Sequence, residues 1–192
     1  MAGTNVAIAH HPQNLWPERP VRDLLSDDLK HMVQGTGGRW RQVAETTVKT
    51  IVHPRIRAVV LFRLSQVMVN RKLVPLAYAL QSRAIRSSGA EINPFAHIDA
   101  GLCLMHSVGI VIGPEVRIGR NVRIYQGVTL GDGSRPGQPT IGDDVVIGAG
   151  AAILGGVTIG DRVFIGANAV VTHDVPDDSV ATGAPAVWRR RR

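Results

Sequence analysis

His106 is the one histidine of the apolar stretch LCLMHSVGIVIG (102–113). An unperturbed imidazole has a pKa of about 6.5, so it can take up a proton and return it under cellular conditions. Either packing tolerates a buried histidine here, or the surrounding chain presents it to a reacting group. The spacing of the apolar residues around it bears on that choice.

The second half of the chain repeats every six residues. Ile112, Ile118 and Ile124 form one run with Leu130, and a second run comprises Ile141, Ile147, Ile153, Ile159 and Ile165. Another aliphatic residue stands two positions before most of these, and Gly, Asp and Asn mark the turns. A helix of period 3.6 cannot keep a six-residue pattern on one face, whereas stacked short strands can. The pattern predicts a mainly β fold, a parallel β-helix with an aliphatic interior.

Two interruptions of this period are informative. Leu104 and Ile112 are eight residues apart, so the pair His106-Ser107 lies at a break of two residues. Leu130 and Ile141 are eleven apart, which predicts a loop over 132–140. Functional residues in solenoids concentrate at such interruptions, because the side chains of a regular repeat are used for packing between coils. The break favours a presented histidine over a structural one.

The first half has helical periodicity. An amphipathic helix is predicted that Pro54 can begin and that buries a face of aliphatic residues, with Arg57, Arg63 and Gln66 largely off that face. The aliphatic face comprises Ile56, Val59, Val60, Leu64, Val67 and Met68. A second helix is expected over 74–87 with Leu76, Leu80 and Ile85, and weaker ones near 20–34 and 40–52. The expected organisation is a flexible arm (1–17), an α-helical N-terminal domain (18–88), the β-helix (89–188) and a basic tail (189–192).

Composition narrows the class of protein. With 192 residues, 44% of them hydrophobic, the chain can bury a sizeable core. A net charge of +7 suits a phosphorylated ligand, but no basic face interleaved with aromatic residues indicates nucleic-acid binding. The one cysteine, Cys103, excludes a disulfide framework and fits the core. With neither a signal peptide nor a membrane span apparent, a cytoplasmic protein is expected.

Four stretches carry a family resemblance. They are EINPFAHI (91–98), HSVGIVIGPEVRIGRNVRIYQGVTLG (106–131), IGDDVVIGAGAAILGGVTIGD (141–161) and IGANAVVTHDVPDDSVATGAPA (165–186). With them the chain resembles the hexapeptide-repeat acyltransferases, and among these the serine O-acetyltransferases. The resemblance implies a left-handed β-helix, a homotrimer with active sites between subunits, and acetyl-CoA as the donor. A dimer of trimers is the alternative assembly.

The resemblance also assigns roles to residues. It implies that His106 is the catalytic base, that Glu91 orients it, and that Gly131, Ala149 and Ala167 contact CoA; it implies no metal. Such a base suits acetyl transfer, because an alcohol must lose its proton as it attacks the thioester. A carboxylate at Glu91 would favour the imidazolium that forms. Glu91 and His106 are fifteen residues apart, which is compatible with neighbouring coils.

Three positions depart from the serine acetyltransferase pattern. Met105 stands where the family has Asp before the catalytic histidine, Gly137-Gln138 replaces an Arg-His pair, and Glu91 replaces Asp. Without these partners both charges of an amino acid are poorly compensated. Met105 and Gln138 are therefore expected at the acceptor, which is predicted to be a sugar, glycan or secondary-metabolite hydroxyl. Free serine, as in cysteine synthesis, is the alternative.

Two other classes remain open. A trimeric binding or scaffold protein would use the basic tail to hold a partner. A metal hydrolase of the γ-carbonic anhydrase kind would need converging histidines, and His97, His106 and His173 lack the expected close spacing.

Overall fold

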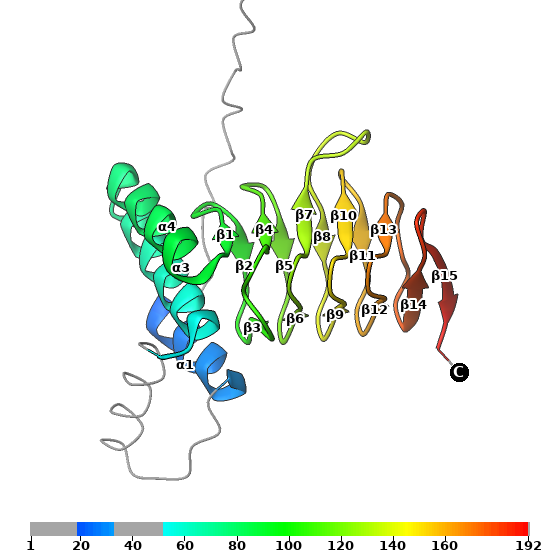
Figure 1. Cartoon of the computed structure of the whole chain (residues 1–192), viewed down its shortest axis with the longest axis horizontal. Coiled ribbons are helices and arrows are strands. Elements are labelled where there is room, and N and C mark those ends of the chain that lie inside the picture. Colours follow the sequence, from blue (N-terminus) through cyan, green and yellow to red (C-terminus); the bar gives the residue numbers. More distant parts are fainter. Residues whose placement is uncertain (1–18, 33–51, 192) are drawn as a thin grey trace, which may run out of the picture.

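The computed structural model describes residues 19–32 and 52–191. In these ranges a helical part, made of α1 (Val21–Met32), α3 (Pro54–Asn70) and α4 (Val74–Ser88), lies at one end of a column of short strands (Figure 1). The strands are β1 (Glu91–Ile92), β2 (His97–Ile98), β3 (Cys103–Leu104), β4 (Val111–Ile112), β5 (Arg117–Ile118), β6 (Arg123–Ile124), β7 (Thr129–Gly131), β8 (Thr140–Ile141), β9 (Val146–Ile147), β10 (Ala152–Leu154), β11 (Thr158–Ile159), β12 (Phe164–Ile165), β13 (Val170–Val171), β14 (Ser179–Thr182) and β15 (Val187–Arg190). The predicted 40–52 helix and the arm over 1–17 fall almost entirely outside the described residues. No helix of the described ranges is long and apolar enough to cross a membrane.

The strands form three sheets that together make a parallel β-helix. The sheet orders are β1-β4-β7-β10-β13, β2-β5-β8-β11 and β3-β6-β9-β12-β14-β15, and every pairing except β14–β15 is parallel. From β1 to β10 each strand therefore pairs with the strand three places further along the chain, in the next coil of the column (Figure 1), whereas β12 pairs with β14. The mainly β solenoid preceded by helices, predicted from the six-residue repeat, is confirmed.

The register of the first sheet measures the length of each coil. Glu91 pairs with Val111, Val111 with Thr129, Thr129 with Ala152 and Ala152 with Val170. The coils thus advance by 20, 18, 23 and 18 residues. Three strands of six residues account for 18, so the first coil contains two extra residues and the third contains five. Both interruptions seen in the sequence are confirmed, and the second is the loop between β7 and β8 that projects from the column (Figure 1).

The interior is the aliphatic ladder that the repeat predicts. Its members are at most 2% exposed: Ile112, Ile118, Ile124, Leu130, Ile141, Ile147, Ile153, Ile159 and Ile165, with Val116, Val122, Val128, Val145, Val157 and Val163 as the second inward set. Cys103 joins this core, and its burial raises the pKa of the thiol. Stacked aliphatic layers of this kind bury large apolar area without aromatic residues.

The buried face of α3 differs from the prediction. Ile56 and Val59 are buried as predicted, but Leu64 is 43% exposed while Arg63 and Gln66 are fully buried, so the prediction is wrong for these three positions. Arg63 is buried because Asp28 of α1 forms an ion pair with it, at 2.8 Å between Nε and Oδ2. A compensating carboxylate from a distant segment overrides the apolar pattern of the helix itself.

The larger apolar residues of the second predicted helix are mostly exposed on α4. Leu76 is 49% and Ile85 39% exposed, while the buried positions are Ala77, Gln81, Ala84 and Ser88. Helices α3 and α4 lie side by side (Figure 1). Small side chains on the packed face allow the two backbones to approach closely, so the larger apolar side chains lie on the open face.

The last strand of the column is β15. Strand β15 pairs antiparallel with β14, with Arg189 opposite Val180 and Arg190 opposite Ser179. The first two residues of the expected basic tail therefore belong to a strand, and Arg189, Arg190, Arg191 and Val180 line a cavity of about 590 Å³.

Acid is expected to destabilise the fold through aspartates at the coil corners. The backbone N–H and guanidinium of Arg120 hold the pKa of Asp143 below its usual value, and the guanidinium of Arg162 does the same for Asp178. A carboxyl whose pKa is lower in the folded state stabilises that state above its unfolded pKa, and this contribution disappears as the pH falls through the folded value. Urea midpoints should therefore decrease below about pH 4. Asp143→Asn should lower the midpoint at pH 7 and flatten its decrease in acid, and an unchanged pH dependence would contradict this.

Candidate active site

His106 is exposed and lies on the two-residue insertion of the first coil. Met105 N–H donates to the Ile124 carbonyl, as Tyr125 N–H does to Ile147 one coil further. Gly127 N–H donates to the Val108 carbonyl, as Gly150 N–H does to Gln126. Met105 and Val108 are thus regular ladder positions, and His106 and Ser107 are the two extra residues between them. The prediction that His106 leaves the ladder is confirmed.

Glu91 lies at the start of β1 with its side chain outward, in the first sheet. Its strand follows the end of α4, and Gly89, two residues earlier, accepts a hydrogen bond from Gly109 N–H at 2.9 Å. Glu91 and His106 therefore flank one corner of the first coil. No hydrogen bond or ion pair joins them within the described part of the chain, so the orienting role of Glu91 stays a prediction.

Ala149 and Ala167 occupy equivalent positions on successive coils. Asn168 N–H donates to the Ala149 carbonyl at 2.8 Å, just as Gly150 N–H donates to Gln126. Val108, Gln126, Ala149 and Ala167 therefore line one corner of the solenoid, where the third sheet turns into the first. The insertion with His106 directly precedes Val108, the first residue of this row of corners. Ala149 and Ala167, which are predicted to contact CoA, therefore lie along the same corner of the solenoid as the histidine.

Gly131 lies apart from that corner, at the end of β7 on the first sheet. A Cβ placed there would meet no atom within 4 Å, and its φ is not in the left-handed region. By contrast, a Cβ on Gly148 would lie 2.6 Å from the backbone nitrogen of Ala167. The fold requires glycine at 148 but not at 131, which is consistent with close approach of another molecule at Gly131.

Met105 and Gln138 both make contacts within the chain. Met105 is half-buried and packs against the core, with its sulfur 3.8 Å from that of Cys103. Gln138 accepts a hydrogen bond from Glu115 N–H at 2.9 Å and donates one to Asp132 at 3.0 Å. The side-chain amide of Gln138 thereby ties the 132–139 loop to the neighbouring coil.

Sequence reasoning missed two helical groups beside the insertion. The Ser88 carbonyl, at the end of α4, accepts a hydrogen bond from Ser107, and Arg55 of α3 approaches the Met105 carbonyl at 3.5 Å. Neither carries a local signal, because both depend on how the helices pack against the first coil.

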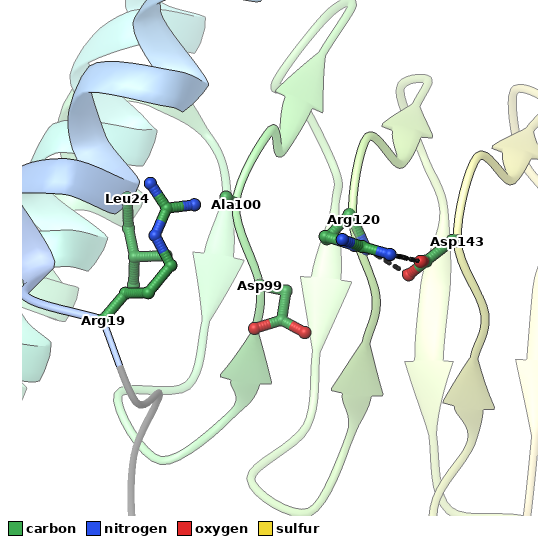
Figure 2. Close-up of a pocket in the computed structure, with 6 residues that line it drawn as sticks. All are labelled: Arg19, Leu24, Asp99, Ala100, Arg120 and Asp143. Atoms are coloured by element: carbon green, nitrogen blue, oxygen red, sulfur yellow. Dashed lines mark hydrogen bonds and ion pairs between the residues drawn. The ribbon is translucent and has the colours of Figure 1, made fainter.

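A separate pocket of about 340 Å³ lies on another corner. Figure 2 shows Arg19 and Leu24 on one side of it, with Asp99, Ala100, Arg120 and Asp143 from successive coil corners. Its two arginines are each paired with an aspartate, Arg120 with Asp143 and Arg19 with Asp27. This pocket does not contain the predicted catalytic residues. Among residues 19–32 and 52–191, no three His, Cys, Asp or Glu side chains converge as metal ligands would.

Comparison with known proteins agrees with this architecture. Residues 138–173 match the family model described as bacterial transferase hexapeptide (six repeats), and residues 109–135 match the hexapeptide repeat of succinyl-transferase. A serine acetyltransferase of Helicobacter pylori is 45% identical over 139 residues, which cover 71% of this chain and 81% of the relative.

Solved structures give the same result. A soybean serine acetyltransferase complexed with serine superimposes with a TM-score of 0.77 at 33% identity, covering 88% of this chain and 69% of that one. A serine acetyltransferase in complex with CoA superimposes with a TM-score of 0.74 at 33% identity and the same coverage. The repeat, the solenoid and these identities together show that the chain is an acyltransferase of the serine acetyltransferase family.

Proposed function

We propose that the protein transfers the acetyl group of acetyl-CoA to the hydroxyl of L-serine. The observation that carries this is the exposed His106 on a two-residue insertion, at the base of the corner formed by Val108, Gln126, Ala149 and Ala167. Relatives crystallised with serine and with CoA support both substrates. The exposed position of His106 supports its role as the base that the reaction needs.

The chemistry assigned to His106 is proton transfer in both directions. The imidazole takes the hydroxyl proton as the serine oxygen bonds to the thioester carbonyl carbon. When the C–S bond breaks, the imidazolium returns that proton to the departing sulfur, so the histidine is regenerated. Glu91, on the other side of the same corner, is proposed to stabilise the imidazolium through its negative charge.

A second candidate acceptor is a sugar or other hydroxyl compound without an amino-acid head group. The observation in its favour is Met105, an apolar side chain directly before His106 that packs on the core and offers no charge to an α-amino group. Gln138 adds to this, because both ends of its amide are already engaged within the chain. The family relationship favours serine, and the chemistry of these two side chains favours the other class.

An acceptor panel separates the two. Release of CoA from acetyl-CoA should be fastest with L-serine, and Met105→Asp should lower the KM for serine by supplying a carboxylate beside its ammonium group. Leu73→Asp, which places a charge of the same sign on the exposed turn before α4, is the control. Faster turnover with sugar hydroxyls than with serine, unaffected by Met105→Asp, would favour the second candidate.

Gly131→Ala should weaken acetyl-CoA binding without weakening the fold. Because a Cβ there meets no neighbour and φ is compatible with alanine, the melting temperature should be unchanged or slightly higher. A methyl group facing the pantetheine arm should raise the Kd for CoA roughly tenfold, the effect of about 1.4 kcal/mol. Calorimetric titration with CoA measures this, and a variant that binds CoA like wild type would remove Gly131 from the donor site.

The proposed assembly is a homotrimer. Val108 is 69% and Val111 38% exposed, so apolar surface lies beside His106 in the isolated chain. A neighbouring subunit that covers this surface would also complete the site, which supports an active site between subunits.

A further inference from the structure

We propose that Ser107 is a positioning residue that sets the direction of His106 by anchoring the two-residue insertion to the end of helix α4. This inference rests on the proposed function, because it assigns a role relative to the histidine base. It concerns the hydroxyl of Ser107 rather than any group that touches substrate.

The anchor is a buried hydrogen bond. Ser107 is 3% exposed, and its Oγ donates to the carbonyl of Ser88 at 2.7 Å. Ser88 is the last residue of α4, and Gly89 ends the helix in the left-handed conformation with φ 72°. A helix leaves its last carbonyls without intrahelical partners, and the Ser107 hydroxyl satisfies one of them.

The ladder bonds on either side cannot replace this anchor. Met105 N–H and Gly109 N–H donate to Ile124 and Gly89 at 2.9 Å each, and equivalent bonds recur in the regular coils. They fix the ends of the insertion, while two residues that no regular coil contains lie between them. The hydroxyl of Ser107 is the side-chain contact that reaches the helical part from within the insertion.

Side-chain direction follows from the anchor. Ser107 is buried, while its neighbours His106 and Val108 are both exposed. The exposure of His106, the burial of Ser107 and the exposure of Val108 alternate as side chains do in an extended segment, so an anchor that draws Ser107 inward leaves His106 outward. A base must be held within about 0.5 Å of its productive position, so freedom in this segment reduces the rate.

The end of α4 provides a matched control. Ser87 precedes Ser88, and its Oγ is buried without a hydrogen-bond partner among the described residues. Ser87→Ala removes a hydroxyl from the same junction without breaking a bond, whereas Ser107→Ala removes the anchor. Ser107→Thr keeps the hydroxyl and tests rescue.

The three variants are assayed as full-length protein for kcat, KM, urea midpoint and amide exchange of residues 105–109. Ser107→Ala should lower kcat roughly tenfold to a hundredfold, leave KM for acetyl-CoA near wild type, lower the urea midpoint only slightly through the loss of one buried hydrogen bond, and speed exchange in 105–109. Ser107→Thr should recover most of kcat, and Ser87→Ala should match wild type in kcat, KM and exchange, with a urea midpoint no lower than that of wild type. A wild-type kcat in Ser107→Ala, or a loss explained by a lower urea midpoint, would overturn the proposal.

The exchange measurement separates this inference from the proposed function. If His106→Ala kept full activity, the proposed base would be wrong, and exchange in 105–109 would still decide whether Ser107 anchors the insertion. Unchanged exchange in Ser107→Ala would overturn the anchor whatever the acceptor proves to be.

Discussion

His106→Ala is expected to reduce acetyl transfer by about 10²- to 10⁴-fold, the range for loss of a general base. The side chain is exposed and lies outside the aliphatic ladder, so its removal leaves the core intact. The decrease should therefore appear in kcat at an unchanged melting temperature. Steady-state release of CoA, together with a thermal melt at one protein concentration, measures both quantities.

The control is a histidine of similar exposure elsewhere on the solenoid. His173 lies on the turn after β13, several coils from the insertion. His173→Ala removes the same imidazole from the surface and should retain wild-type turnover. Equal activity of wild type, His106→Ala and His173→Ala would exclude His106 as the base.

Arg63→Met is expected to lower the free energy of unfolding by about 3–5 kcal/mol, the cost of leaving one buried charge without its partner. Arg63 and Asp28 are both 0% exposed. The five N–H groups of Arg63 are all engaged, two by Asp28 and one each by Gln66 and the carbonyls of Ile98 and Asp99.

The effect is large because Asp28 also holds the first coil. Its Oδ1 accepts hydrogen bonds from Gly101 and Leu102 N–H at 2.8 and 2.9 Å. The pair therefore joins α1 and α3 to the segment that leads into β3 and the His106 insertion. Losing Arg63 leaves a buried carboxylate at this junction.

A surface ion pair provides the comparison. Arg135 and Asp174 are joined at 3.1 Å with side chains 51% and 55% exposed. Arg135→Met should cost less than about 1 kcal/mol, as exposed pairs do. Urea unfolding of both variants at equal protein concentration tests the contrast, and similar midpoints would show that the buried pair contributes no more than the surface one.

Local periodicity determined the solenoid. An isoleucine or leucine every six residues has to face the interior, so the parallel coils, the aliphatic core and the two interruptions follow from spacing alone. The position of His106 at a two-residue break can be predicted in the same way, because an insertion between strands changes the spacing of the aliphatic residues in the sequence.

The helical part was less predictable. Arg63 and Gln66 lie at positions that helical periodicity assigns to solvent, and their burial depends on Asp28, which lies 35 residues before Arg63 in the sequence. The exposure of Leu76 and Ile85 likewise depends on which face of α4 meets α3. Long-range pairing decides such cases, and a local pattern carries no information about it.

The sequence by itself determined the repeat, the solenoid and the residue that breaks it, because each is a property of spacing along the chain. Tertiary structure decided what surrounds that residue: the alignment of Ala149 and Ala167 above it, the separate position of Gly131 and the contact of Ser107 with Ser88. These are relations between coils, or between a coil and a helix end. They arise only when segments some 20 residues apart come into register.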